Sequence, residues 1–544
     1  MLSDRETIPE TLRTAAERGV GELVFHLDEG RSRLAWDELS ERAGHGAREL
    51  AARGVEPGDR VGLLGPNRPE WAVWAYATWT AGATLVPIQI PLRVRDAAAF
   101  SERLRSLVEA AGCRIVLADT RLLGALPDGI GVAWDLPGRT PGAHPPGPEP
   151  DDTAVIQFTS GSTAAPKGAV LSHRAVMAQM RLLYSLLGGR PADALSWMPL
   201  FHDLGLFGYL LTPVSFGGTC HILPTERFAR DPAEWLRLIG STRVARTTLP
   251  GSALGAAIRA AARRSEQIDL SSLEIAWFAA EGVDPEVADR LIESAQRFRL
   301  PLEALGSTYG LAEAVLAVAA TPPGDGLRFD RVGLTELVAS GVAAPAGAGP
   351  ARRIACCGRP APGTEVRIMG ADGALAERHV GEILVRGPSL MQGYVGEDVP
   401  DPWIDGWLRT GDAGYLADGE LYITGRLKDM VIVMGHNYYP EDFEWAAGRV
   451  PEVRAGRCVA FADVAGEEVV VLVEARAEAD PGALSRKVRR ALSDAVGIAP
   501  GEVLVLPRDT VEKTTSGKLR RAAMRDAYLR GELVPLGRLE GSRS

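Results

Sequence analysis

Apolar residues follow helical and extended spacing in turn along the first part of the chain. From Trp36 to Leu50 they recur at the spacing of an amphipathic helix, and residues 69–81 predict a second helix that begins at a proline. The stretch EPGDRVGLLG predicts a turn into a buried strand, and GATLVPI predicts another strand. Helices and strands that alternate with short turns predict an α/β fold with a mostly parallel sheet.

The composition changes at two places. Residues 137–152 are rich in proline, glycine and polar residues, which predicts a loop before the apolar stretch AVIQF. Beyond residue 425 the pattern predicts helices at 440–448 and 481–496, four strands and a basic tail. Because 544 residues exceed one ordinary domain, we expect a large N-terminal domain over 1–425 and a small C-terminal α+β domain over 426–544.

The overall composition excludes several classes of protein. The chain has no run of 18 apolar residues, so no membrane span is predicted. Its polar, acidic start does not resemble a secretion signal. The formal charge of -10 argues against nucleic acid as the main partner. Five scattered cysteines fit a reducing compartment, so we expect a cytoplasmic protein without a disulfide framework.

Lysine is scarce, which makes each lysine informative. Nearly all of the 60 basic residues are arginine, and lysine occurs only at 167, 428, 487, 513 and 518. An ammonium and a guanidinium are not interchangeable. A lysine inside a polar motif is therefore a candidate for chemistry of its own.

Two motifs in the large domain are suited to a nucleotide. FTSGSTAAPKG, residues 158–168, is a flexible loop whose hydroxyls and lysine can wrap phosphate oxygens, although a polar surface turn has the same composition. It lacks the spacing of a Walker loop. In STYGLAEA, Tyr309 can stack on a purine and Glu313 can hold a hard cation, while an ordinary helix start is the alternative.

Two further motifs lie around and beyond the boundary at 425. Asp412, in the TGD motif, can accept hydrogen bonds from paired ribose hydroxyls, and Arg426 follows at the boundary itself. Lys518 lies in the Ser/Gly-rich stretch TSGK, where an ammonium can reach a carboxylate or an α-phosphate as charge develops. A hairpin at ADGE and a solvated basic tail are the alternative interpretations of these stretches.

Together and in this order, the phosphate loop, YGxxE, TGD, GRxKD and TSGK resemble the adenylate-forming superfamily over nearly the whole chain, from Trp36 to Arg521. This superfamily includes acyl-CoA synthetases, peptide-synthetase adenylation domains and luciferases. WMPLFHDLGLFG, GRLKDMVIVMGHNYYPEDFE and an extra segment at about 324–353 make the chain most similar to the fatty acyl-AMP ligases, which load acyl carrier proteins in lipid or polyketide biosynthesis. In those ligases the extra segment restrains a mobile small domain and disfavours coenzyme A; a tolerated surface loop is the alternative. We expect the segment to pack against the 426–544 domain through its apolar residues Leu327, Phe329, Val332, Leu334 and Leu337.

The resemblance implies a set of site residues. Lys518 would be catalytic, His202 would orient the acid, Glu313 would bind Mg²⁺ and Lys428 would be the hinge. The nucleotide ATP would be held by Thr159, Ser160, Gly161, Ser162, Thr163, Lys167, Ala280, Glu281, Gly282, Ser307, Thr308, Tyr309, Gly310, Asp412, Tyr422, Arg426 and Lys518. The partners would be a carboxylic acid and a holo acyl carrier protein supplied in trans.

Two positions depart from the family pattern. Ala164 replaces a usual loop glycine, and residues 247–258 lack the Asn-Phe-Ala-Tyr run often found where relatives line the acyl pocket. The chain length and class of the acid are therefore open. An acid:CoA ligase on the same fold is the main alternative function; an amino-acid adenylating enzyme and a non-catalytic relative remain as further ones.

Overall fold

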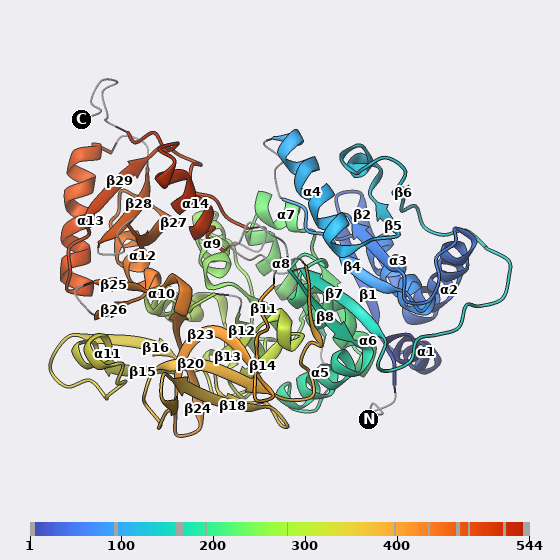
Figure 1. The fold of residues 1–544 in the computed structure, drawn as a ribbon, viewed down its shortest axis with the longest axis horizontal. Helices are drawn as coiled ribbons and strands as arrows, with labels where there is room; N and C mark the ends of the chain where they lie inside the picture. Colours follow the sequence, from blue (N-terminus) through green and yellow to red (C-terminus); the bar gives the residue numbers. More distant parts are fainter. Residues whose placement is uncertain are drawn as a thin grey trace.

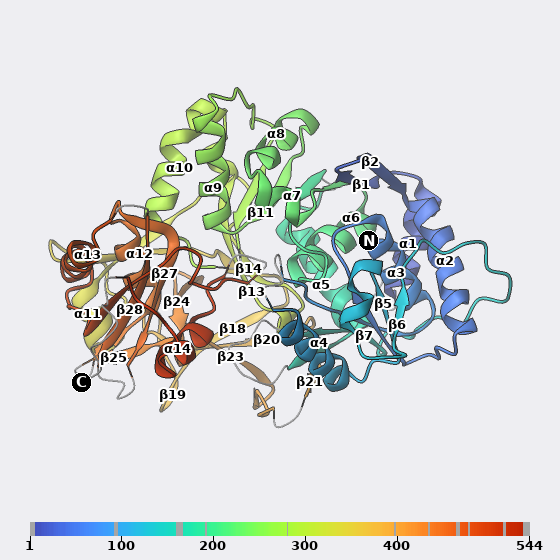
Figure 2. The same cartoon turned by 90° about the horizontal axis from the view of Figure 1, so that it is seen from above.

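The structure is a computed structural model that describes residues 6–91, 96–158, 167–190, 193–279, 281–396, 399–433, 436–463, 468–476, 479–514 and 518–536. Two large sheets with flanking helices come first in the chain, a third sheet follows, and a smaller group of strands and helices forms the C-terminal part (Figure 1). Figure 2 gives the same arrangement from above. The predicted α/β fold class is confirmed.

The first sheet has nine strands in the order β17-β14-β13-β12-β11-β9-β10-β1-β2. Neighbours are parallel from β13 to β1, whereas β2, β14 and β17 pair antiparallel at the two edges. The strands are β1 (Glu22–Leu27), β2 (Gly30–Ala35), β9 (Ala194–Ser196), β10 (Thr219–Ile222), β11 (Arg246–Leu249), β12 (Ile275–Phe278), β13 (Leu305–Gly310), β14 (Ala317–Ala320) and β17 (Arg359–Pro360).

The second sheet has seven strands in the order β21-β8-β7-β4-β3-β5-β6. It is parallel from β7 to β6, and β8 and β21 add an antiparallel edge. Its strands are β3 (Arg60–Leu64), β4 (Thr84–Pro87), β5 (Ile115–Ala118), β6 (Gly131–Ala133), β7 (Thr153–Phe158), β8 (Gly168–Ser172) and β21 (Gly393–Val395). The mostly parallel sheet expected from the alternating pattern is therefore present twice.

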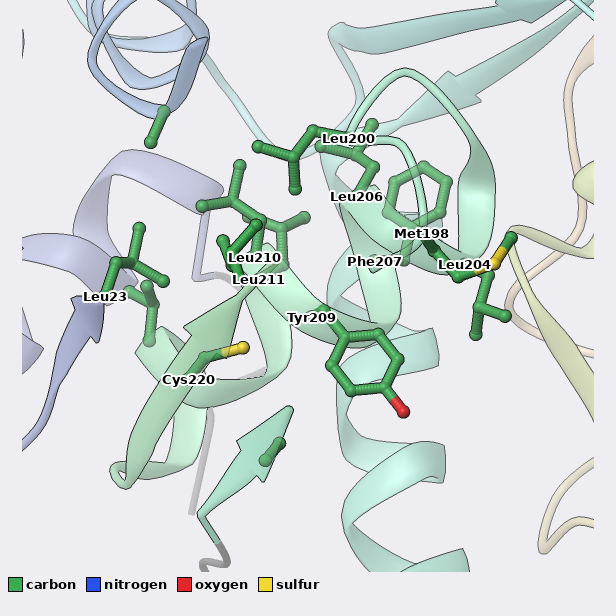
Figure 3. Close-up of a cluster of buried hydrophobic side chains, with 14 of the residues drawn as sticks. Leu23, Met198, Leu200, Leu204, Leu206, Phe207, Tyr209, Leu210, Leu211 and Cys220 are labelled. Atoms are coloured by element: carbon green, nitrogen blue, oxygen red, sulfur yellow. The ribbon is translucent and has the colours of Figure 1, made fainter. Parts of the chain in front are cut away.

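Helices cover these sheets and fill the space between them. The two helices predicted first are confirmed as α2 (Trp36–Ala52) and α3 (Pro69–Thr80), and residues 137–149 form the predicted loop. One large apolar cluster joins both sheets to the helices, and Figure 3 shows its part around the π-helix η2 (Leu204–Leu211). The other helices of this region are α1 (Ile8–Arg18), α4 (Ala97–Ala111), η1 (Thr120–Ala125), α5 (His173–Leu186), α6 (Thr212–Phe216), α7 (Thr225–Arg230), α8 (Ala233–Thr242), α9 (Gly251–Arg263), α10 (Pro285–Phe298), η3 (Leu302–Ala304) and η4 (Ala312–Ala314).

A third sheet is fully antiparallel. The sequence indicated only one part of it, the hairpin at ADGE. That hairpin joins the two longest strands of the sheet, and Asp418 and Gly419 both have positive φ (55° and 73°), as a two-residue type I′ turn requires. The strands are β18 (Glu365–Gly370), β19 (Gly373–Ala374), β20 (Gly381–Arg386), β22 (Trp403–Ile404), β23 (Trp407–Ala417) and β24 (Glu420–Arg426).

The C-terminal part has an apolar core of its own. The helices predicted at 440–448 and 481–496 are confirmed as α12 (Pro440–Gly448) and α13 (Pro481–Val496). The prediction of a basic tail is partly wrong, because residues 521–529 form helix α14 (Arg521–Leu529), with Met524 buried and Tyr528 packed beside it. The remaining elements are η5 (Leu427–Asp429), β25 (Val431–Val433), β26 (His436–Tyr438), β27 (Val453–Ala462), β28 (Val469–Ala475) and β29 (Glu502–Leu506).

The extra segment packs against the C-terminal part, as predicted. It forms a hairpin of β15 (Phe329–Gly333) and β16 (Ala351–Ala355) with α11 (Leu334–Ser340) between the strands, and α11 contacts β26 (Figure 1). At the other end of the segment, Arg352 pairs with Asp442 of α12 at 2.8 Å. The contact is therefore partly ionic.

The prediction of which apolar residues make this contact is wrong. Val332 and Leu337 pack instead on Tyr415 and Tyr422 of the third sheet, and Leu327, Phe329 and Leu334 are likewise absent from the described C-terminal core, which takes Val338 from this segment. One residue of an α-helix turns by about 100°, so Leu337 and Val338 face different neighbours. Within the described ranges, none of the helices is both long and apolar enough to cross a membrane.

Candidate active site

The candidate residues gather where parallel strands of the nine-stranded sheet end. Strands β9, β11, β12 and β13 run in one direction, so their C-terminal ends lie at one edge. The segments that follow β9 and β12 carry His202 and Glu281, and the end of β13 carries Tyr309. Ligands of α/β sheets bind outside this edge, and the predicted residues come from several of these strands.

Tyr309 and Arg426 hold the two oxygens of one carboxylate. The Tyr309 hydroxyl donates to Asp412 Oδ2 at 2.8 Å, and Arg426 Nε lies 3.0 Å from Asp412 Oδ1. Asp412 lies on β23 directly opposite Arg426 on β24, so the hairpin register sets this pair. Each carboxylate oxygen has a further lone pair, which leaves Asp412 able to accept hydrogen bonds from a ligand.

Burial dominates the electrostatics of this group. Burial raises the pKa of Asp412, while Arg426 opposes the rise. Asp412 in turn raises the pKa of Arg426. Burial, followed by the Asp412 charge, raises the pKa of Tyr309 far above its usual value. The phenol is therefore a fixed donor to Asp412, and its ring, 7% exposed, belongs to an apolar cluster.

A second chain of contacts links Lys167 to Glu313. Tyr394 donates its hydroxyl to Glu313 Oε1 at 2.7 Å, and the Lys167 ammonium lies 3.4 Å from that hydroxyl and 4.4 Å from the ring centre. Pairing of β21 with β8 places Tyr394 opposite Ala169, two residues after Lys167. The structure thus joins the described end of the phosphate-loop motif to the YGxxE carboxylate.

His202 and Asp203 lie between β9 and the π-helix η2. Nδ1 of His202 faces Oδ1 of Asp203, and Leu204 N donates to Asp203 Oδ1 at 2.6 Å. Burial alone would raise the pKa of Asp203, but His202 and Lys518 together hold it below its usual value. The imidazole is therefore held in one orientation by its neighbour.

Lys518 reaches the same place from the C-terminal part. Its backbone is tied to Thr514: Thr514 N donates to Lys518 O at 2.8 Å and Lys518 N donates to Thr514 Oγ1 at 3.0 Å. Burial lowers the pKa of Lys518, and the carboxylates of Asp203, Asp412 and Glu281 act against that change. One ammonium thus lies within electrostatic range of residues from three segments of the large part.

The backbone segment Glu281–Gly282 borders both parts of the molecule. A side chain at Gly282 would come within 3.3 Å of the Trp445 ring of α12, so glycine permits this close approach. Glu281 is half-buried and acts on both Lys518 and Lys513. Ala280 and the predicted residues Thr159, Ser160, Gly161, Ser162 and Thr163 lie outside the described residues.

Four predicted residues are not joined to these contacts through their side chains. The Ser307 hydroxyl lies 3.5 Å from Cys357 Sγ, and Thr308 Oγ1 donates to Ala319 O at 2.8 Å. Gly310 allows Leu316 O to approach, where a side chain would clash at 1.7 Å. Tyr422 stacks on Tyr415 with ring centres 4.9 Å apart, beneath the extra segment. Nucleotide binding by these residues remains a prediction.

Lys428 lies in η5, directly after Arg426. The residue is exposed at the surface, and partial desolvation of its ammonium lowers its pKa while Asp429 opposes the change. Arg426, Lys167 and Asp412 also act on it. Its predicted role as a hinge is not tested by these contacts.

Sequence reasoning missed three groups of contact residues. Asp203 adjoins His202 in the quoted motif, so its position alone was a usable signal. Tyr394 lies in a Gly-Tyr-Val stretch that gives no sequence signal of a functional role. Arg521 pairs with Glu444, Glu441 and Asp429, but its motif resembled a solvated tail.

Residues 12–395 match the family described as AMP-binding enzyme. This chain belongs to the AMP-binding enzyme family. A Caulobacter vibrioides relative, provisionally named an acyl-CoA synthetase, is 34% identical over 97% of this chain and 96% of its own length. JamA of Moorena producens, a medium-chain-fatty-acid–[acyl-carrier-protein] ligase, is 29% identical over 92% of this chain and 90% of its own.

A solved structure shows the same fold at high similarity. It comes from studies of fatty acyl-adenylate ligases of E. coli and L. pneumophila, has a TM-score of 0.90 and is 30% identical, and the alignment covers 97% of this chain and 98% of that one. The resemblance read from the motifs is confirmed at the level of family and fold. In this arrangement the Glu313 carboxylate and the Lys518 ammonium both lie within electrostatic range of the Asp412 carboxylate.

Proposed function

We propose that this chain activates a carboxylic acid, of the fatty or a related class, with ATP and transfers the acyl group to a phosphopantetheine thiol of an acyl carrier protein. The observation that carries the proposal is the position of Lys518. It enters from the C-terminal part and lies within range of Asp203, Asp412 and Glu281 at the sheet edge. A cation there serves a reaction in which an anionic acid attacks an anionic phosphate.

In the first half-reaction, a carboxylate oxygen of the acid attacks the α-phosphorus of ATP. The bond from that phosphorus to the bridging oxygen of the β-phosphate breaks, and pyrophosphate leaves. Lys518 stabilises the charge on the acid and the α-phosphate, and His202, held by Asp203, orients the acid. Positioning and charge stabilisation account for the catalysis, because the protein itself forms no covalent bond.

The nucleotide would be held by the two contact chains. Asp412, fixed by Tyr309 and Arg426, accepts the ribose hydroxyls. Lys167 and the preceding loop bind the β- and γ-phosphates. Tyr309 stacks on adenine only with the exposed part of its ring, since most of that ring is buried.

Mg²⁺ is the metal proposed for this site, with Glu313 as its protein ligand. One Glu313 oxygen accepts from Tyr394, which orients the carboxylate. Among the described residues no cluster of three or more metal-ligating side chains exists. A lone carboxylate suits a Mg²⁺ shared with substrate phosphates, which neutralises their charge when bound.

In the second half-reaction, the thiol sulfur attacks the carbonyl carbon of the acyl-adenylate. The bond to AMP breaks, AMP leaves and the thiol proton passes to solvent. We propose that the part from 426 onward, a small domain by its separate core, pivots at Lys428 and withdraws Lys518 so that the thiol can enter. The contacts of the extra segment with α12 favour the pose described here over others.

An acid:CoA ligase is the second candidate, favoured by the name of the Caulobacter vibrioides relative. One experiment tests both candidates. A panel of acids with ATP is screened for pyrophosphate release, and the acid that works is then offered to a holo carrier protein, to its apo form as the control without a thiol, and to coenzyme A. Acyl transfer to the holo carrier with little acyl-CoA supports the proposal. Equal or faster acyl-CoA formation replaces it with the second candidate, and no pyrophosphate release with any acid removes both.

A further inference from the structure

A fully buried carboxylate lies in the sheet of the C-terminal part, away from the proposed reaction. Glu474 is 0% exposed and belongs to β28, the middle strand of that sheet, whose other residues are valine, leucine and alanine (Figure 1). Because successive residues of a strand point to opposite faces, Glu474 faces the same way as Val470 and Leu472, which belong to an apolar cluster. A buried charge is costly unless its partners compensate it, so this position requires an explanation.

The two oxygens of Glu474 hold the chain where it leaves β29. Oε1 accepts from Val511 N at 2.7 Å, and Oε2 pairs with Arg454 of β27. Arg454 also reaches Asp509 Oδ1 at 3.1 Å. Residues 507–511 thus turn from the end of β29 back to the neighbouring strand, and Glu474 fixes the end of that turn.

Both backbone polar groups of Val511 are bound by side chains. Arg457 Nη1 donates to Val511 O at 2.6 Å, while Glu474 accepts from Val511 N. The Val511 side chain is 1% exposed and packs in the same apolar cluster as Leu506 and Met524. Val511 is therefore held in three directions, and the residues after it extend from a fixed position.

From Val511 the chain runs beside the segment that carries Lys518. Arg520 N donates to Glu512 O at 3.1 Å, and Thr514 N donates to Lys518 O at 2.8 Å. An antiparallel bridge lies between these two contacts. The two runs are therefore joined by their backbones, and a shift of one run moves the other.

The register of this pair places Val511 opposite Arg521. Glu444 accepts from the Arg521 guanidinium with both oxygens, at 2.7 Å and 2.8 Å. Glu474 and Glu444 thus hold the two runs at the same level. Lys518 is three residues from Arg521, about 10 Å in an extended chain, so the place of its ammonium depends on both carboxylates.

We propose that Glu474 is a positioning residue for acid activation, which fixes Val511 and thereby the place of the Lys518 ammonium. Its hydrogen bonds are to Val511 and Arg454, so it acts on the reaction through Lys518. This inference rests on the proposed function, since it concerns the first half-reaction at the same site. A displacement of about 1 Å caused by a residue far from the chemistry can lower a rate about 100-fold.

The test measures both half-reactions in variants of the full chain, with an acid that the wild type activates. Glu474→Leu keeps most of the side-chain volume but removes the acceptor for Val511 N, whereas Glu474→Gln keeps an oxygen for that hydrogen bond. Arg457→Met removes the donor to Val511 O and changes a less buried residue. Glu502→Leu is the control, because Glu502 of β29 is partly buried in the same part and accepts from the Tyr528 hydroxyl at 2.7 Å. Urea unfolding verifies the folding of each variant.

We expect Glu474→Leu to lower the kcat of pyrophosphate release about 100-fold, with the KM for ATP little changed. Glu474→Gln should restore most of that rate, Arg457→Met should lose about tenfold, and Glu502→Leu should stay near the wild type. Consumption of a preformed acyl-adenylate by the holo carrier protein should stay near that of the wild type in every folded variant, because Lys518 does not serve that step.

The deciding comparison adds Glu474→Leu to Lys518→Ala. Since Glu474 acts through the ammonium, the double variant should release pyrophosphate as slowly as Lys518→Ala and no more slowly. A residue that only stabilises the fold would lower the rate by the same factor in both backgrounds, and that result overturns the inference.

Wild-type pyrophosphate release in a folded Glu474→Leu also overturns the inference, as does an equal loss of both half-reactions. Where Glu474→Leu does not fold, Arg457→Met decides, and wild-type release in that variant overturns the inference. These outcomes leave the proposed function in place. A wild-type chain that releases no pyrophosphate with any acid removes the proposed function and this inference with it.

Discussion

The two sides of the candidate active site are held by different kinds of contact. On the large side, Asp412 and Glu313 are each fixed by a tyrosine hydroxyl, at 2.8 Å and 2.7 Å, on strands and turns of the sheets. On the small side, Lys518 lies three residues before Arg521, and its backbone is hydrogen-bonded to Thr514. Arg521 is held in turn by carboxylates of η5 and α12.

The difference extends to the contact between the two parts. Arg352 pairs with Asp442, Arg449 of α12 pairs with Glu286 at 2.7 Å, and the small core takes Val338 from the extra segment. Interfaces between parts that move resemble transient protein interfaces, which are more polar than a core. The comparison teaches that sheet strands hold the proposed nucleotide side, whereas the contact between the two parts is partly polar, as the proposed displacement of Lys518 requires.

The largest effect, on the free energy of unfolding, is expected from the ion pairs of Arg521, which hold the segment that carries Lys518. Arg521→Gln leaves the buried Glu444 without its two-oxygen partner, and breaking a buried pair costs about 3–5 kcal/mol. Urea unfolding of the whole chain should show this loss in the C-terminal transition. Arg520→Gln is the control, because Arg520 is more exposed and pairs with Glu512; an exposed pair contributes about 0–1 kcal/mol. Equal losses in both variants would remove the special position of Arg521.

The nucleotide side should respond in affinity. Asp412→Ala removes a charged hydrogen-bond acceptor, an effect of about 1.5–3 kcal/mol on ATP binding. Calorimetry of ATP binding measures it, with the unfolding midpoint as the check on folding. Unchanged ATP affinity in a folded Asp412→Ala would take Asp412 out of the site.

Weakening the contact between the extra segment and the C-terminal part should change the choice between carrier protein and coenzyme A more than it changes the rate of acid activation. Arg352→Met combined with Asp442→Asn removes both charges of the link. A tenfold change in the balance of poses needs about 1.4 kcal/mol, so acyl-CoA formation should rise about tenfold while pyrophosphate release changes little. Arg353→Met is the control, because Arg353 pairs with Asp289 inside the large part. A rise in the control alone would place the restraint elsewhere.

The extra segment is better tested by these point changes than by its deletion. Val332 and Leu337 cover Tyr415 and Tyr422. Removing residues 327–350 would uncover that cluster, so a loss of folding would mask any change in the choice of thiol.

The smallest effect concerns pH. Burial raises the pKa of Asp442 from 3.8 to about 6, although Arg352 opposes the rise. Because the folded value lies above the unfolded one, the folded protein binds the proton first, and this group adds stability as pH falls from 6 toward 4. As pH falls over that range, the unfolding midpoint of the wild-type chain should rise relative to that of Asp442→Asn. Above pH 7 the two midpoints should change with pH in parallel. A parallel course from pH 4 to 7 would contradict the raised pKa.

Much of this architecture was predictable because it rests on local pattern. Helices α2, α3, α12 and α13 follow apolar spacing and proline starts, and the Asp-Gly turn of β23–β24 follows from its residues. The third sheet and α11 were not predicted, since short antiparallel strands depend on partners distant in sequence. The motifs identified Lys518, Asp412, Arg426 and Glu313, but only the fold brings Tyr394 onto Glu313 and Glu474 onto Val511.

The central claim is that Lys518 serves the first half-reaction only. The direct measurement is the rate of each half-reaction in Lys518→Ala: pyrophosphate release with acid and ATP, and consumption of a preformed acyl-adenylate by the holo carrier protein. We expect the first rate to fall about 100-fold or more, as for the loss of a residue that stabilises developing charge, and the second to remain near that of the wild type. Wild-type pyrophosphate release, or an equal loss of both rates in a folded variant, would contradict the claim.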